Sequence, residues 1–140
     1  MSTTTTAVEI DGLKIFFSGD TEYDTSLRKL KPFGIQAAFL CINGVGGNMN
    51  AYEAALLGWQ LGATTLVPMH HYLWQNVSGG DEATLDPRLL ETTYSNLGGN
   101  GRVIAPVIGQ EIVLGRVRRP TRASSKPARN TQSGIKKPRS

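Results

Sequence analysis

Short apolar runs alternate with polar, glycine-rich segments along most of this chain. Two of the runs, 7–10 and 13–18, flank Asp11-Gly12, a dipeptide typical of tight hairpin turns, and predict an antiparallel hairpin. Further apolar runs predict the remaining strands at 35–42, 64–68, 103–108 and 111–114. The run at 35–42 is almost continuously apolar, as expected for a strand that is covered on both faces.

Helices are expected between these strands. The clearest covers 50–61, where Asn50 and Glu53 match a capping box. The other two are expected at 27–30, after the cap residues 24–26, and from Asp86-Pro87 onward. This alternation of strand and helix predicts an α/β layered fold with its loops gathered at the strand ends.

Charge divides the chain into a body and a tail. Nine of the 15 lysine and arginine residues lie within 116–140, a segment without Asp or Glu, so residues 1–115 carry six basic against 11 acidic side chains. The tail has almost no apolar residues, and we expect it to be disordered. We also expect disorder at 1–6, which leaves one domain at 7–115. The tail lacks interleaved aromatic residues for base stacking, which argues against a nucleic-acid-binding role.

The sequence predicts a soluble cytoplasmic protein. Its single cysteine, Cys41, builds no disulfide framework and lies in an apolar run typical of a buried residue. No signal peptide is visible at the start of the chain, and no apolar stretch approaches the ~20 residues of a membrane span.

Three sequence motifs follow predicted strands. The first is Phe16-Phe17-Ser18-Gly19-Asp20-Thr21, the second is Ile42-Asn43-Gly44-Val45-Gly46-Gly47-Asn48-Met49-Asn50, and the third is Leu66-Val67-Pro68-Met69-His70-His71. The first and third each place a candidate metal ligand, Asp20 or His70, just past a buried strand. A side chain at such a position is held by the sheet and still open to a cleft.

Together the motifs resemble the C-terminal half of metallo-β-lactamase-superfamily proteins, in the branch that is similar to L-ascorbate-6-phosphate lactonase. The resemblance covers about residues 13–114 and implies part of an αββα sandwich with a metal site at one edge. It also implies a metal-dependent hydrolase that uses zinc or manganese to activate water. In the family, the Asp of Gly-Asp-Thr and a late His ligate metal, and these positions match Asp20 and His70.

The chain departs from the family pattern in its ligands. It contains no His-x-His-x-Asp-His motif, and its only histidines are His70 and His71. Adjacent residues of an extended segment point in opposite directions, so only one of the two is expected to face a metal. Since a catalytic zinc normally takes three protein ligands, Asp20 and His70 supply only part of a site.

Several other residues are candidates for the pocket. They are Asn43, Gly44, Asn48, His71, Tyr72 and Trp74. The Gly44–Asn50 loop is either a tight turn that ends in a helix cap or a pocket wall that contacts a phosphorylated or carboxylated substrate. His71 either lines the pocket or caps the strand, and Tyr72 and Trp74 either rim the site or lie outside it.

The first functional hypothesis is therefore a lactonase-like, metal-dependent hydrolase that acts on a small-molecule substrate and is present as a C-terminal portion. The alternative is a catalytically inactive remnant, or a half-domain that folds with a missing N-terminal half or as a homo-oligomer. Half of a sandwich exposes an apolar sheet face, which favours such association.

Overall fold

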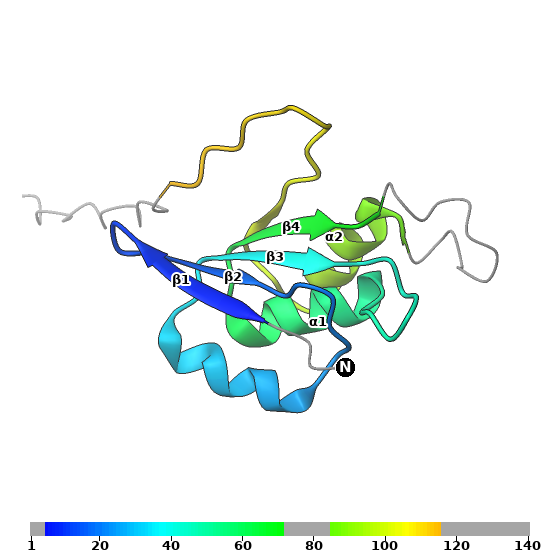
Figure 1. Cartoon of the computed structure of the whole chain (residues 1–140), viewed down its shortest axis with the longest axis horizontal. Helices are drawn as coiled ribbons and strands as arrows, with labels where there is room; N and C mark the ends of the chain where they lie inside the picture. The colour runs from blue at the N-terminus through cyan, green and yellow to red at the C-terminus, as the bar shows by residue number, and fades with distance from the viewer. Residues whose placement is uncertain (1–4, 72–84, 116–140) are drawn as a thin grey trace, which may run out of the picture.

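A five-stranded sheet forms the centre of the computed structural model, which describes residues 5–71 and 85–115 (Figure 1). The strands lie in the order β1-β2-β3-β4-β5, and only the β1–β2 pair is antiparallel. Their bounds are Thr6–Ile10 for β1, Leu13–Phe17 for β2, Ala37–Cys41 for β3, Thr65–Met69 for β4 and Arg102–Val103 for β5. The mixed α/β fold class is thus confirmed.

The β1–β2 hairpin has the turn that its sequence predicts. Ile10 pairs with Leu13, and the two intervening residues, Asp11 and Gly12, have φ angles of 51° and 74°. Two successive positive φ angles are typical of the type I′ turn, whose twist matches that of the flanking strands.

Three helices lie between the strands in residues 5–71 and 85–115. The 3₁₀-helix η1 covers Thr25–Phe33, α1 covers Ala51–Leu61 and α2 covers Pro87–Asn96. The capping box of α1 is confirmed, because Asn50 Oδ1 accepts from Glu53 N at 2.9 Å while Glu53 Oε2 accepts from Asn50 N at 3.0 Å. The helix expected at 27–30 is longer than predicted and runs past Pro32. Its last turn closes at Gly34, whose N donates to Lys31 O at 3.1 Å.

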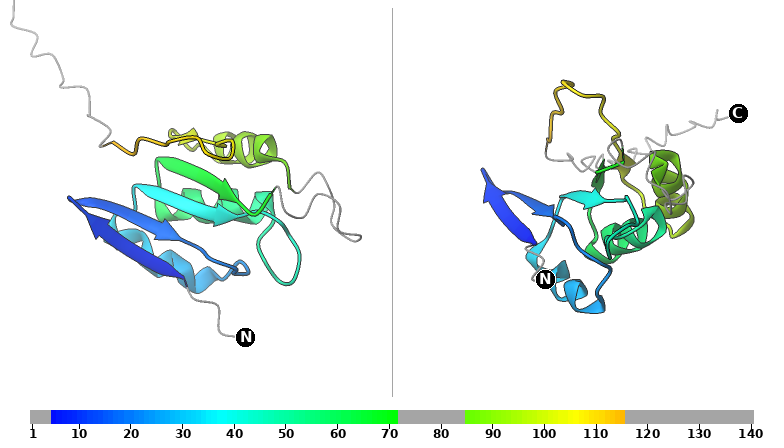
Figure 2. Two further views of the ribbon diagram at one scale, coloured as in Figure 1. Left: turned by 45° about the horizontal axis from the view of Figure 1, so that its top comes forward. Right: turned by 45° about the vertical axis from the view of Figure 1, so that its right-hand side comes forward.

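The main core lies between the sheet and α1, which also contacts η1 and α2 (Figure 2). Phe16, Ala38 and Leu66 face this core from three adjacent strands and are fully buried. Gly58 of α1 lets the helix approach closely, since a Cβ atom there would lie 2.6 Å from Leu66 Cδ2. The register of the parallel strands decides where the residues after each strand lie.

The second face of the sheet carries the alternate residues of the same strands. On this face the rings of Phe17 and Phe39 stack with centroids 4.8 Å apart, and both side chains are partly exposed. Ile15 and Val67 are buried beside them. An apolar face therefore lies opposite α1.

The closing strands predicted at 103–108 and 111–114 are wrong. Only Arg102–Val103 pairs with β4, and residues 104–115 form an irregular segment that reverses at a turn closed by the Gln110 N to Val107 O hydrogen bond. Three of the apolar side chains that suggested strands are exposed instead, namely Val107, Ile108 and Val113 at 63%, 93% and 75%. Apolar composition predicted a strand, but in the described part of the chain the segment bonds to β4 only at its first residue, where Ile104 N donates to Leu66 O at 2.9 Å.

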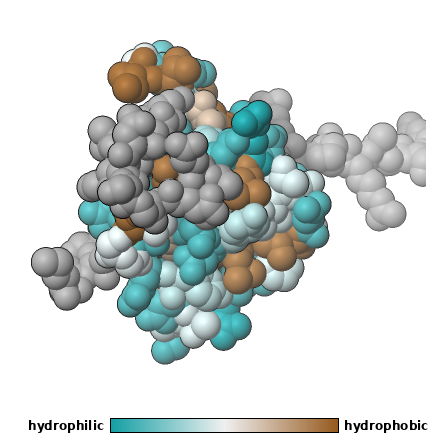
Figure 3. All heavy atoms as spheres, turned by 90° about the vertical axis from the view of Figure 1, so that its right-hand side faces the viewer, coloured by the Kyte–Doolittle hydropathy of each residue, from teal (hydrophilic) through white to brown (hydrophobic). Residues whose placement is uncertain are grey.

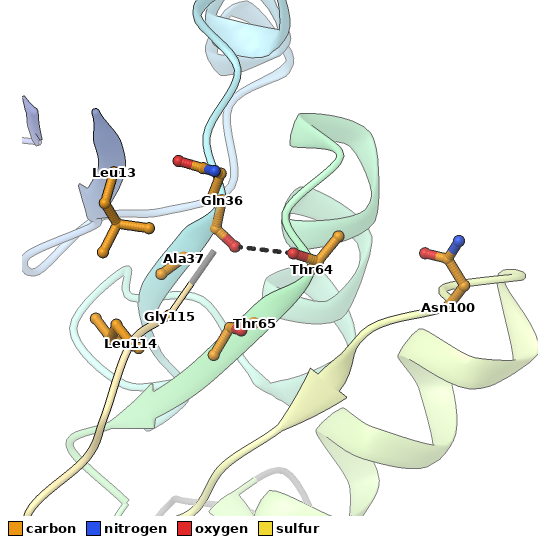
Figure 4. Close-up of a pocket in the computed structure, with 8 residues that line it drawn as sticks. All are labelled: Leu13, Gln36, Ala37, Thr64, Thr65, Asn100, Leu114 and Gly115. Atoms are coloured by element: carbon orange, nitrogen blue, oxygen red, sulfur yellow. Dashed lines mark hydrogen bonds between the residues drawn. The ribbon is translucent and has the colours of Figure 1, made fainter. Parts of the chain in front are cut away.

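This segment returns to the second face of the sheet near the amino ends of the strands. There Leu114 borders a cavity of about 350 Å³ whose floor includes Ala37 and Thr65 (Figure 4). The cavity lies at the opposite end of the strands from Asp20 and His70, so it is separate from the candidate site. None of the described helices has the length and apolar character needed to span a lipid bilayer.

Candidate metal centre

The candidate site forms where β2, β3 and β4 end. Because the three strands are parallel neighbours, the residues that follow them meet at one edge of the sheet. Figure 3 views the molecule from the side toward which these strands point. The turn after β2 carries Asp20, β3 continues into Asn43, and His70 follows β4 directly.

Ser18 fixes the turn that presents Asp20. Its buried hydroxyl accepts a hydrogen bond from Cys41 N at 3.0 Å and donates to Gly19 O at 2.9 Å. Gly19 has a φ of 59°, a left-handed conformation that glycine adopts without steric cost. Ser18 belongs to the first motif but was not among the candidate site residues, because its hydrogen-bond partner Cys41 lies on the neighbouring strand.

Asp20 and His70 lie together. His70 Nδ1 is 2.9 Å from Asp20 Oδ1, and the two side chains are 32% and 70% exposed, respectively. Asn48 Nδ2 donates to the same carboxylate oxygen at 3.3 Å. The structure thus brings together two residues that are fifty positions apart, and it leaves both open to solvent.

His70 has strained backbone geometry. Its φ is 65°, and left-handed conformations of residues with a Cβ cost free energy. Strain of this kind concentrates at functional sites, where the surrounding structure maintains it. Here the strained backbone turns His70 toward Asp20 immediately after the last residue of β4.

His71, the next residue, has a different environment. It is buried, and burial lowers the pKa of its imidazole, while the negative charge of Asp86 at the start of α2 acts in the opposite direction. Its burial distinguishes His71 from the partly exposed His70. Its assignment to the pocket stays a prediction.

The other predicted pocket residues have different outcomes. Asn48 contacts Asp20, and Asn43 and Gly44 lie at the end of β3. Tyr72 and Trp74 lie outside the described residues. Within the described ranges, no cluster of three or more His, Cys, Asp and Glu side chains could hold a metal ion.

The pair nevertheless fits a divalent metal chemically. An imidazole nitrogen and a carboxylate oxygen are both common metal ligands, and two ligands of one tetrahedral zinc lie roughly 3.3 Å apart given metal–ligand bonds of ~2.0–2.2 Å. The observed 2.9 Å separation needs only a small adjustment to reach this value. Asp20 and His70 thus offer one carboxylate and one imidazole of the kinds that bind a divalent metal.

Comparison with known proteins supports the fold. No protein-family model and no curated protein matches the chain. Among solved structures, it is similar to Igni18, a metallo hydrolase from the archaeon Ignicoccus hospitalis, with a TM-score of 0.55 and 21% identity over 69% of this chain. It is also similar to the metallo-β-lactamase fold protein YhfI from Bacillus subtilis, with a TM-score of 0.45 and 19% identity over 71% of this chain.

The similarity to Igni18 shows that the chain shares part of the fold of that metallo hydrolase. The chain spans only 39% of the Igni18 chain and 44% of the YhfI chain. The fold agrees with the sequence resemblance, and the structural neighbours include metal-dependent hydrolases. At these identities the likeness establishes the fold alone.

Proposed function

We propose that this chain is part of a metal-dependent hydrolase with a metallo-β-lactamase fold. The observation that carries the proposal is the 2.9 Å contact between Asp20 and His70, which joins the ends of β2 and β4. These are the two positions at which the sequence resembles the family's ligands. A remnant without a site would not require His70 to keep a strained backbone.

Four residues of the chain would bind a divalent ion, zinc or manganese, or position its ligands. Asp20 and His70 would bind it, Asn48 orients the carboxylate through its hydrogen bond, and Ser18 holds the turn below. When bound, the metal supplies an activated water and polarises a carbonyl or phosphoryl group. Because Asp20 and His70 are both partly exposed, a small substrate can approach them from solvent.

The proposed substrate is a lactone that carries a phosphate or carboxylate group. This follows from the lactonase-like motifs and from the Gly44–Asn50 loop, whose glycines at 44, 46 and 47 have positive φ angles and keep side chains away from the backbone. Gly46 and Gly47 have open space where a Cβ atom would lie. Such a loop can approach an anionic group closely.

The test is metal binding by the full chain. We would titrate Mn²⁺ and Zn²⁺ by isothermal calorimetry into the wild type and into Asp20→Ala, His70→Ala and Glu91→Ala. Glu91 is an exposed residue of α2, so its variant matches the charge change of Asp20→Ala away from the site. We expect the two site variants to bind more than about 10-fold more weakly, since loss of even an outer-shell partner costs this much. Equal affinities in all four proteins would refute the proposal.

A partner-dependent half-domain is the second candidate. The partly exposed Phe17–Phe39 pair on the second sheet face favours it, as does the short span of the chain relative to Igni18. Two sandwich layers normally bury such residues between them. Sedimentation velocity would show concentration-dependent association of the wild type that Phe39→Lys weakens. A monomer at all concentrations would count against self-association through this face.

A further inference from the structure

Asn43 follows β3 at the edge of the sheet where Asp20 and His70 lie. Since β3 separates β2 from β4, the Asp20–His70 contact reaches across the end of β3. The β3–β4 pairing continues one residue past β3, through the Ile42 N to Met69 O hydrogen bond of 3.1 Å, and Asn43 is the next residue. Three adjacent parallel strands therefore place Asp20, Asn43 and His70 at the same edge.

Backbone hydrogen bonds tie Asn43 to the turn that carries Asp20. Gly44 N donates to Met49 O at 3.0 Å, and Met49 N donates to Thr21 O at 2.9 Å. Asn43 also forms an isolated antiparallel bridge with Asn50. The main chain around Asn43 is thus fixed relative to Asp20, whatever its side chain does.

The side chain of Asn43 is an exception among the asparagines of this loop. Asn48 donates to Asp20, and Asn50 caps α1, so both have a local task. Asn43 is only 2% exposed, and its Oδ1 atom has no hydrogen-bond partner in the described part of the chain. A buried carbonyl oxygen without a donor destabilises the folded state, and an ion or water is a common reason for one.

We infer that the Asn43 amide oxygen is a third protein ligand of the cation held by Asp20 and His70. The inference rests on the proposed metal site and deepens it. It raises the ligands from two to three, the number that a catalytic metal site normally takes. Two oxygens and one imidazole nitrogen suit Mn²⁺, because carboxylate and carbonyl oxygens are its preferred ligands.

The test follows Mn²⁺ binding by the loss of the free-ion electron paramagnetic resonance signal, with full-length wild type, Asn43→Ala, Asn43→Asp and Asn100→Ala. Asn100 is exposed at the opposite end of the strands, so its variant is the matched control. We expect Asn43→Ala to raise the dissociation constant by about 10- to 100-fold and Asn100→Ala to leave it unchanged.

The Asn43→Asp variant tests whether Asn43 is a metal ligand or only a structural residue. A buried carboxylate near Asp20 should lower the thermal midpoint of the metal-free protein, and Mn²⁺ should restore it by binding the native state. A lowered midpoint that Mn²⁺ does not restore would overturn the inference, and so would unchanged Mn²⁺ affinity in Asn43→Ala. If Asn43→Ala does not fold, the Asn43→Asp result decides.

The outcomes distinguish this inference from the proposed function. If Asp20→Ala and His70→Ala lose Mn²⁺ while Asn43→Ala keeps wild-type affinity, only the role of Asn43 is overturned. If the wild type binds no Mn²⁺, or binds it equally well without Asp20, both ideas fail.

Discussion

The strained backbone of His70 makes a quantitative prediction. At a φ of 65°, a residue with a Cβ atom costs roughly 1–2 kcal/mol, whereas glycine adopts this conformation freely. We therefore compare His70→Gly with His70→Ala, since both remove the imidazole and its contact with Asp20. Glycine gives back about 0.4–1 kcal/mol through the greater freedom of the unfolded chain. The expected result is that His70→Gly is more stable than His70→Ala by about 0.5–1 kcal/mol.

The assay is urea unfolding or thermal unfolding, each followed by circular dichroism. EDTA is present so that bound metal does not contribute to the stability. For a domain of this size, the expected difference corresponds to a shift in the thermal midpoint of roughly 2–8 °C. Comparison with the wild type adds the loss of the Asp20 contact, which is exposed and worth only ~0–1 kcal/mol. An alanine variant at least as stable as the glycine variant would show that the backbone of His70 is not strained.

Three further predictions concern the scaffold. Burial raises the pKa of Tyr94, so the folded state favours the protonated phenol. The resulting contribution to the free energy of unfolding is present below pH ~10 and is lost as the pH rises through the pKa of Tyr94 in the folded state. Tyr94→Phe should flatten this alkaline decline in unfolding experiments and cost about 1 kcal/mol at neutral pH through its lost hydrogen bond. Gly101→Ala should cost more than about 1 kcal/mol, because the new Cβ would lie 2.2 Å from the carbonyl oxygen of Thr64; a neutral effect in denaturant titration would refute this close approach. Asn50→Ala should cost ~1 kcal/mol by breaking the capping box with Glu53, and unchanged stability would show that water replaces the cap.

Local sequence signals predicted most of the fold, because each rests on the chemistry of a few neighbouring residues. The Asp11-Gly12 turn and the Asn50 cap are examples, and both are confirmed. The strands predicted at 103–108 and 111–114 failed because a strand needs a partner edge, which no local pattern supplies.

The candidate site was predicted only in part. The motifs identified Asp20 and His70, and parallel pairing explains why residues so distant in sequence meet. The strain at His70 and the Asn43 oxygen that lacks a partner among the described residues depend on three-dimensional packing and have no sequence signal. The role of Ser18 likewise has no sequence signal, since its hydrogen-bond partner Cys41 belongs to the neighbouring strand.

The departures from local rules argue against an inactive remnant. His70 has a positive φ, and Asn43 has a buried oxygen without a partner in the described ranges; each destabilises the folded chain by itself. The contact that His70 gains with the exposed Asp20 is worth too little to offset the strain. Both departures lie at the ends of adjacent strands, and one cation bound by both residues would account for both. A sequence that only needed to fold would reach greater stability with glycine at position 70, so the observed histidine favours a metal site over a scaffold that has lost its function.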